Sequence, residues 1–204
     1  PHQLDMYQWL VGMPSRVKAS VALGKYHDIY VEDDVTALLE WKDGASGVFI
    51  ASTGEWPGVN RLEISGDRGR MVIEGDKIVL TRLAGSVAET VRTTDKVAEG
   101  PAATTETLSP AAAEGQLVGH AGLVKNFVEA IRGQAGLVSP GVEGLNSLEL
   151  ANAMILSGVE DRAVDLPLDA EAYAALLKRL IAKAPGKPAK GAPRKGRVFG
   201  VIDV

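Results

Sequence analysis

The sequence predicts an α+β fold built on a largely antiparallel, open sheet of about six or more strands, with helices packed on one face. Apolar residues alternate with period two through successive segments before residue 84, and they recur with helical spacing in the last part of the chain. The turns between the strand segments are short, and short turns join antiparallel neighbours because a parallel pair needs a long crossover. The segregation of strands and helices leaves one sheet face free to pair with another domain or subunit.

The first expected element is a helix at the very start of the chain. Pro1 suits a first helical turn, where its missing N–H is not needed, and Gly12 and Pro14 end the helix. The apolar residues at helical spacing are Leu4, Tyr7, Leu10 and Val11. No Met precedes Pro1 and no signal-peptide pattern follows it, so we expect a piece of a longer, cytoplasmic protein.

The strands are expected from alternating apolar residues and from the turns between them. Leu39 and Trp41 share one face of a strand, and Asp43-Gly44 supplies the hairpin turn that follows it. The expected strands are 16–23, 34–41, 45–52, 61–65, 70–74 and 77–83. Between Ala84 and Gln116 the pattern weakens, which indicates an irregular excursion or a pair of weak edge strands.

Three further helices complete the expected domain, which spans residues 1–182. They lie at about 118–132, 144–159 and 169–183, and Asp169 is the expected N-cap of the last. The following stretch is rich in Pro, Gly, Ala and Lys and cannot bury enough apolar area to offset the entropy of ordering. We therefore expect a disordered basic linker at 183–197 and a short apolar tail at 198–204.

The composition excludes several classes of protein. The 204 residues are 46% hydrophobic and 24% charged, as in ordinary globular proteins, and no apolar run approaches the roughly 18 to 20 residues of a membrane helix. The absence of cysteine excludes disulfides, thiolate metal sites and cysteine nucleophiles. A net charge of −4 gives no electrostatic footprint for nucleic acid. The usual nucleotide-binding, hydrolase and zincin motifs do not occur.

The first candidate for chemistry is His2. It lies in the first turn of the opening helix, where the positive end of the helix dipole favours a neutral imidazole that can accept a proton. Asp5 and Trp9 follow three and seven residues later on the same face, so the carboxylate could orient the ring and the indole could form a wall of a pocket. The alternative is a surface histidine near a helix end.

A loop at 53–61 gathers side chains that suit a polyhydroxylated ligand, which needs hydrogen-bond partners and a flat apolar surface. Its candidate substrate-binding residues are Glu55, Trp56, Asn60 and Arg61. His120, at the start of an expected helix, is a further candidate for lining a cleft. Two alternatives remain: Arg61 pairs with Glu63 or Asp67 on the sheet surface, and His120 is a partly exposed neighbour of a helix cap.

His27 stands close to several acids, which raises the question of a metal site. Asp28, Glu32, Asp33 and Asp34 follow it without the regular spacing of metal ligands. Such a cluster indicates a solvated loop or the start of a strand, and we expect no metal.

Several segments resemble one family of enzymes. PHQLDMYQWLVGMPSRVKA resembles the start of the C-terminal domain of the glucose-fructose oxidoreductase, inositol dehydrogenase and MocA (Gfo/Idh/MocA) family, in which a helix carries H-x-x-D and then stops at small residues. The segments 24–75, 119–158 and VDLPLD (164–169) resemble later stretches of that family, in the same order. The resemblance covers about residues 1–182, whereas the basic linker and the final RVFGVIDV are not part of the family pattern.

The resemblance implies the substrate-binding and oligomerisation half of an NAD(P)-dependent oxidoreductase that acts on CH–OH groups of a sugar, cyclitol or related polyol. His2 matches the family's catalytic histidine, which assists proton transfer at the substrate while hydride moves to or from nicotinamide, and Asp5 matches an orienting aspartate. NAD or NADP would be held mainly by a Rossmann domain upstream of Pro1, so the isolated chain is not expected to be active. The expected partners are a small-molecule substrate and further copies of the chain, with no nucleic acid and no membrane.

Two alternatives stay open at this stage. The chain is a non-catalytic sugar-binding or oligomerisation module built on the same domain, or the basic stretch 183–197 binds nucleic acid or another anionic surface. The second is disfavoured, because a basic tail of this composition is more often a solvated one.

Overall fold

The computed structural model describes residues 2–97, 99–109 and 118–184. The chain divides into two compact units, of which one joins Pro1–Trp56 to Gly141–Val204 and the other is Pro57–Pro140. Each unit holds a four-stranded sheet, and every described strand pair is antiparallel. The α+β class predicted from the sequence is therefore confirmed.

The first unit orders its strands β3-β2-β1-β8. Its strands are β1 (Arg16–Leu23), β2 (Glu32–Glu40), β3 (Ser46–Ser52) and the two-residue β8 (Val164–Asp165). Its helices are α1 (His2–Val11), the 3₁₀ turn η1 (Gly141–Glu143), α4 (Gly144–Glu160) and α5 (Ala170–Lys183). Asp169 caps α5 as expected, because its carboxylate accepts the backbone N–H groups of Glu171 and Ala172.

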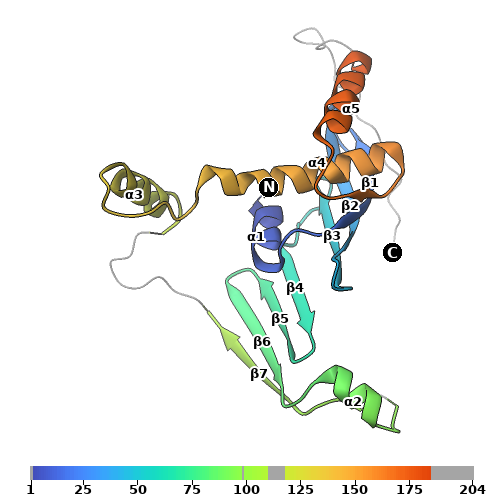
Figure 1. The fold of residues 1–204 in the computed structure, drawn as a ribbon, viewed down its shortest axis with the longest axis vertical. Coiled ribbons are helices and arrows are strands. Elements are labelled where there is room, and N and C mark those ends of the chain that lie inside the picture. Colours follow the sequence, from blue (N-terminus) through green and yellow to red (C-terminus); the bar gives the residue numbers. More distant parts are fainter. Residues whose placement is uncertain (1, 98, 110–117, 185–204) are drawn as a thin grey trace. The chain divides into compact units, whose positions relative to one another are not determined.

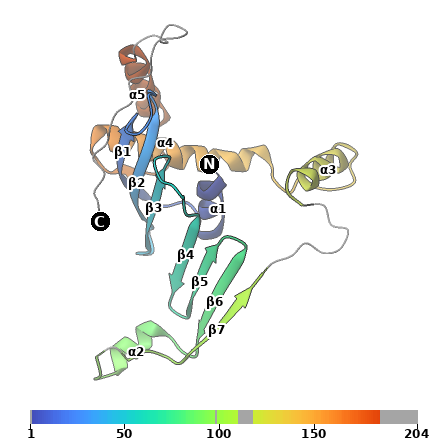
Figure 2. The same cartoon turned by 180° about the vertical axis from the view of Figure 1, so that it is seen from behind.

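The core of this unit lies between the sheet and α4, which runs across β1 in both views (Figures 1 and 2). Val17 and Ala19 of β1 stand opposite Leu39 and Ala37 of β2, and all four are buried. The alternation read from the sequence thus places one strand face in the core. From α4 and α5, the buried apolar residues are Leu150, Ala153, Met154, Leu156 and Leu176. A glycine at position 158 permits this contact, since a Cβ there would meet the side chain of Val21.

The second unit orders its strands as a simple meander, β4-β5-β6-β7, seen in Figure 1. These strands are β4 (Arg61–Gly66), β5 (Gly69–Glu74), β6 (Lys77–Leu83) and β7 (Ala103–Leu108), and the helices are α2 (Val87–Thr93) and α3 (Gly119–Ile131). Leu62, Ile73, Ile78 and Leu108 stand side by side on one sheet face. This row is the apolar side that the alternation predicts.

Two expectations need correction. The strands form two sheets rather than one, because the connection between β3 and β4 contains Gly54, Pro57 and Gly58, and no ladder joins those strands within the described residues. In its described residues, 84–97 and 99–109, the weakly patterned segment holds a helix, α2, and one strand, β7, where we expected an irregular excursion or a pair of weak edge strands. Ser86 caps α2 by accepting the N–H of Glu89, a local signal that strand periodicity does not detect.

Some expectations concern residues outside the described ranges. The linker at 183–197 lies there apart from Lys183 and Ala184, and so does the whole tail at 198–204. In the described part of the chain, no helix has the length and apolar character that crossing a membrane requires.

Candidate functional site

Helix α1 carries the three residues predicted to act together: His2, Asp5 and Trp9. All three side chains are exposed, and Trp9 retains 74% of its accessible surface. Leu4 and Tyr7 point the other way and are buried, so the helix is fixed on the core by its apolar face. The structure therefore presents the predicted residues on the outward face of a firmly packed helix.

The carboxylate of Asp5 ties α1 to α4. Its Oδ1 accepts a hydrogen bond from the Oγ of Ser147 in the first turn of α4, and a second from Nε2 of the buried Gln8 at 3.1 Å. These contacts are to α4 and to α1 itself rather than to the ring of His2. Asp5 is thus placed to hold the helix that carries His2.

The far end of α1 is fixed by two aromatic rings. The ring centroids of Tyr7 and Trp41 lie 6.1 Å apart at a tilt of 55°, and Nε1 of Trp41 donates to the backbone oxygen of Gly12 at 3.3 Å. A cavity of about 460 Å³ opens beside this end of the helix. Its lining residues are Met13, Pro14, Ser15, Trp41, Lys42, Asp43, Glu149, Leu166 and Pro167, and none of them is a predicted site residue.

The predicted binding loop at 53–61 is divided between the two units. Glu55 and Trp56 belong to the first, and the side chain of Trp56 is almost fully exposed, at 96%. Asn60 and Arg61 belong to the second, where both are exposed. A flat, accessible indole fits the predicted role of Trp56 as a surface for a ligand ring.

Arg61 is held by two carboxylates on the surface of the second sheet. Its Nη2 lies 2.6 Å from Glu63 and its Nη1 lies 2.8 Å from Glu74. The hydrogen bonds that the guanidinium donates, first to Glu63 and then to Glu74, raise its pKa. The surface pairing with Glu63 that the sequence left open is therefore present. Asp67 instead accepts hydrogen bonds from Ser86 and from the N–H of Ala88.

His120 lies in the first turn of α3, in the second unit, and its side chain is exposed. Gly119 before it has a φ of +59°, a left-handed conformation that glycine adopts without strain. This glycine sets the direction in which the chain enters α3 at His120.

A further polar cluster surrounds Asp33, at the start of β2. Its side chain is fully buried and accepts the backbone N–H groups of Lys25, Tyr26 and His27 at 2.8, 2.7 and 3.0 Å. Nδ1 of His27 lies 3.3 Å from the same carboxylate and 3.2 Å from Oγ1 of Thr53. The cluster therefore folds the segment 24–31 around one carboxylate and joins it to the end of β3.

The electrostatics of Asp33 follow from these contacts. Burial alone would raise the pKa of this carboxyl, but the three backbone hydrogen bonds, together with the one from the His27 side chain, outweigh burial and hold the pKa at about 2. The sequence indicated either a solvated loop or the start of a strand for this acidic segment. Asp33 lies at the start of a strand, but its side chain is buried rather than solvated. Within the described ranges, no group of three or more His, Asp or Glu side chains has a metal-binding arrangement.

Part of this chain matches a known protein family. Residues 1–72 match the family model of the GFO/IDH/MocA C-terminal domain. This stretch includes all of α1, the first sheet up to β3, and the Asp33 cluster. None of the curated proteins compared with the chain matches it.

Two similar solved structures are WlbA dehydrogenases, both in complex with NADH and UDP-GlcNAcA. The Bordetella pertussis protein is 25% identical, with a TM-score of 0.58, over 82% of this chain and 43% of its own. The Chromobacterium violaceum protein is 28% identical, with a TM-score of 0.60, over 82% of this chain and 44% of its own. A levoglucosan dehydrogenase in complex with NADH and L-sorbose, at 18% identity and a TM-score of 0.59 over 82% and 49%, shares the fold.

The chain spans less than half the length of these three structures. The resemblance inferred from the sequence is confirmed by the match of the family model and by the shared fold. Residues 1–72 of this chain are identified as matching the GFO/IDH/MocA C-terminal domain.

Proposed function

We propose that this chain is the substrate-binding and subunit-contact half of an NAD(P)-dependent oxidoreductase that acts on a sugar, cyclitol or related polyol. The observation that carries the proposal is the family match over residues 1–72, which contains His2 and Asp5 on a helix tied to the core. The two WlbA structures hold NADH and a nucleotide sugar, and these ligands support the class of cofactor and substrate.

The dinucleotide does not fit the described residues of this chain. All of their strand pairs are antiparallel, and they contain neither a βαβ unit nor a glycine-rich phosphate loop at a helix N-terminus. The cofactor, which supplies hydride chemistry when bound, is assigned to a segment outside this chain. We therefore derive only substrate binding and proton transfer from the residues present.

His2 is the residue to which we assign the proton. Its imidazole accepts the proton of the substrate hydroxyl during oxidation, and its conjugate acid returns the proton in the reverse direction. Its place in the first turn of α1, with an exposed side chain, leaves the ring accessible to a small molecule.

Asp5 is assigned the role of a positioning residue. Because its carboxylate contacts Ser147 and Gln8, it acts on His2 through the placement of α1 rather than by contact with the ring. A positioning role of this kind matters because proton transfer requires the donor and acceptor to lie within hydrogen-bond distance.

The substrate contacts that we propose are the residues predicted from the sequence, taken unit by unit: Trp9, Glu55 and Trp56 in the first, and Asn60, Arg61 and His120 in the second. Two exposed indoles, a carboxylate and an amide offer stacking and hydrogen bonding to a sugar ring. Of this set, Arg61 already has two carboxylate partners, so it would contact a substrate with its remaining N–H groups.

Self-association is assigned to the open face of the first sheet. Leu38, Val48 and Ile50 lie on the face opposite the core and are 44%, 59% and 64% exposed. Leu38 stands directly opposite Val48 in the ladder, so the apolar residues form one patch. A patch of this kind on a sheet face favours contact with a second copy of the chain.

The proposal is tested in the protein that carries its upstream sequence. Reduced nicotinamide formation is followed with NAD and with NADP against a panel of free sugars, cyclitols and nucleotide sugars. We expect turnover with at least one member of the panel. Sugar binding without any change in nicotinamide absorbance would instead support the non-catalytic module.

A further inference from the structure

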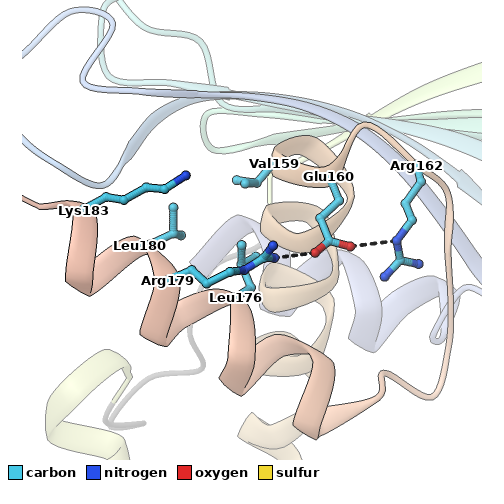
Figure 3. A pocket seen from close by; sticks show the side chains of 7 residues that line it. All are labelled: Val159, Glu160, Arg162, Leu176, Arg179, Leu180 and Lys183. Carbon is cyan, nitrogen blue, oxygen red and sulfur yellow. Dashed lines mark hydrogen bonds and ion pairs between the residues drawn. The ribbon is translucent and has the colours of Figure 1, made fainter.

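A second cavity lies in the first unit, between the ends of α4 and α5, and it contains none of the residues assigned to substrate. Its volume is about 430 Å³, within the size range of small-molecule pockets. Val159 of α4 and Leu176 and Leu180 of α5 form its apolar lining, and Leu176 is almost completely buried. Figure 3 shows these three side chains between the two helices.

The polar lining of this cavity is dominated by positive charge. Arg162, Arg179 and Lys183 border it, with Glu160 as the single acid. Glu160 lies between the two arginines, 2.8 Å from Nε of Arg162 and 2.6 Å from Nη2 of Arg179 (Figure 3). One carboxylate therefore faces three cations, and the cavity carries an excess of two positive charges.

The nearest other acid does not reduce this excess. Asp161 follows Glu160 in the chain, but its carboxylate pairs with Lys18 of β1 at 2.6 Å and does not line the cavity. Nζ of Lys183 has no hydrogen bond or ion pair with any other residue in the part of the chain that the structure describes. Lys183 is thus a cation beside the cavity that still lacks an anionic partner there.

The arginines also keep donors for a further anion. Arg179 uses only Nη2 toward Glu160, so within the described residues its Nε and Nη1 have no acceptor. Its side chain is 59% exposed, and ion pairs of that exposure are weak and exchange readily. Guanidinium groups bind phosphate through paired N–H donors, and a lysine adds a point charge.

We propose that this cavity binds a phosphate monoester carried on an apolar chain or ring. The phosphate lies between Arg179 and Lys183 at the rim, and the apolar part packs on Val159, Leu176 and Leu180. The site does not depend on the proposed oxidoreductase function, because it shares no residue with α1 or with the loop at 53–61.

The test uses the full 204-residue chain and a series of alkyl phosphates below their micelle concentrations. Butyl, hexyl and octyl phosphate are titrated by calorimetry, with inorganic phosphate and octanol as references. We expect affinity to rise about fourfold for each methylene that enters the cavity, because each buried methylene contributes about that factor. Inorganic phosphate and octanol should each bind at least tenfold more weakly than octyl phosphate.

Two variants and a matched control locate the site. Lys183→Gln removes a cation that has no described ion pair, so the fold is expected to persist, and octyl phosphate should bind about tenfold more weakly. Arg179→Gln should weaken binding by a similar factor, with thermal unfolding measured in parallel because it also loses the pair with Glu160. Lys178→Gln, on the same helix but outside the lining, should leave the affinity unchanged.

Other results would overturn the proposal. Equal weakening by Lys178→Gln and Lys183→Gln would show general charge attraction rather than a site, and equal binding of octanol would remove the role of phosphate. A phosphate monoester comes either from a free metabolite or from a lipid headgroup. Binding to phosphatidylcholine vesicles that contain phosphatidic acid, lost in Lys183→Gln, would identify the lipid source, whereas binding of octyl phosphate alone would identify the soluble one.

Discussion

The Oγ atom of Ser157 accepts a hydrogen bond from the backbone N–H of Ala19 at 2.9 Å. Ala19 is in β1, beyond the two residues that pair with β8, so this N–H has no strand partner on that side. The same hydroxyl donates to the backbone oxygen of Arg162 at 2.5 Å. One buried side chain of α4 thus completes the sheet edge and closes the end of its own helix.

Ser157→Ala is therefore expected to destabilise the protein by about 1–3 kcal/mol, because it leaves a buried N–H without an acceptor. Denaturant unfolding measures the loss. Ser20→Ala, on the exposed face of the same strand, serves as the control and should change stability by less than about 0.5 kcal/mol. Equal effects from both substitutions would show that the hydrogen bond does not matter.

The Asp33 cluster should make stability depend on pH in the acid range. The pKa of Asp33 is about 2 in the folded protein and 3.8 as the ordinary value, so the unfolded chain binds this proton more readily. The stabilisation is complete above pH 3.8 and is lost as the pH falls through about 2. Urea unfolding measures the free energy of unfolding of the wild type and of Asp33→Asn. The difference between the two proteins should narrow as the pH falls through this window.

Asp28→Asn provides the control for that experiment, because Asp28 is an exposed acid of the same loop. The unfolding free energy of Asp28→Asn, plotted against pH, should run parallel to that of the wild type. If the difference in unfolding free energy between the wild type and Asp33→Asn stayed constant down to pH 2, the lowered pKa of Asp33 would be contradicted.

His2→Asn in the protein with its upstream half should lower turnover by about 10²- to 10⁴-fold, the usual contribution of a general base. Steady-state kinetics gives the value, and circular dichroism checks the fold. Gln3→Ala changes an exposed neighbour on α1 and should leave turnover within about twofold. Unchanged turnover in His2→Asn would remove this residue from the mechanism.

Asp5→Ala should act through the position of α1. We expect kcat to fall about tenfold while its pH profile keeps its shape, because Asp5 carries no proton in the proposed reaction. Ser147→Ala should reproduce part of the loss, since it removes the same contact from the α4 side. In a double-mutant cycle the two residues should couple by about 0.5–3 kcal/mol. Additive effects would argue against the hydrogen bond between Ser147 and Asp5.

Val48→Glu should weaken self-association by about tenfold to a hundredfold, because it places a charge in the apolar patch on the open face of the first sheet. Analytical ultracentrifugation over a range of concentrations measures the change. Val91→Glu, an exposed position on α2, is the matched control. The open face is not the interface if both variants keep the mass of the wild type.

Most of the secondary structure could be predicted from local pattern. The alternation of Val17 and Ala19, and the helical spacing of Leu4 and Tyr7, report a single buried face, and burial of one face is a property that short sequence windows carry. Asp169 capped its helix as predicted because an N-cap contact reaches only two or three residues along the chain.

The site could be predicted less completely. The sequence placed His2 and Asp5 on one helix face, but it paired Asp5 with His2 because they are neighbours along the chain. Ser147, the residue that Asp5 contacts, lies 142 positions away, and no local pattern connects them. The burial of Asp33 was missed for the same reason, since an acid among acids usually indicates solvent.

Short-range periodicity and motifs in the sequence were enough to predict the class of fold, most strands and helices, and the family resemblance. Three features became visible only in the folded chain: the strands form two sheets, backbone N–H groups enclose Asp33, and Glu160 pairs with both Arg162 and Arg179 at one cavity. These features depend on which distant segments meet, and such meetings follow from packing of the whole chain rather than from any one segment.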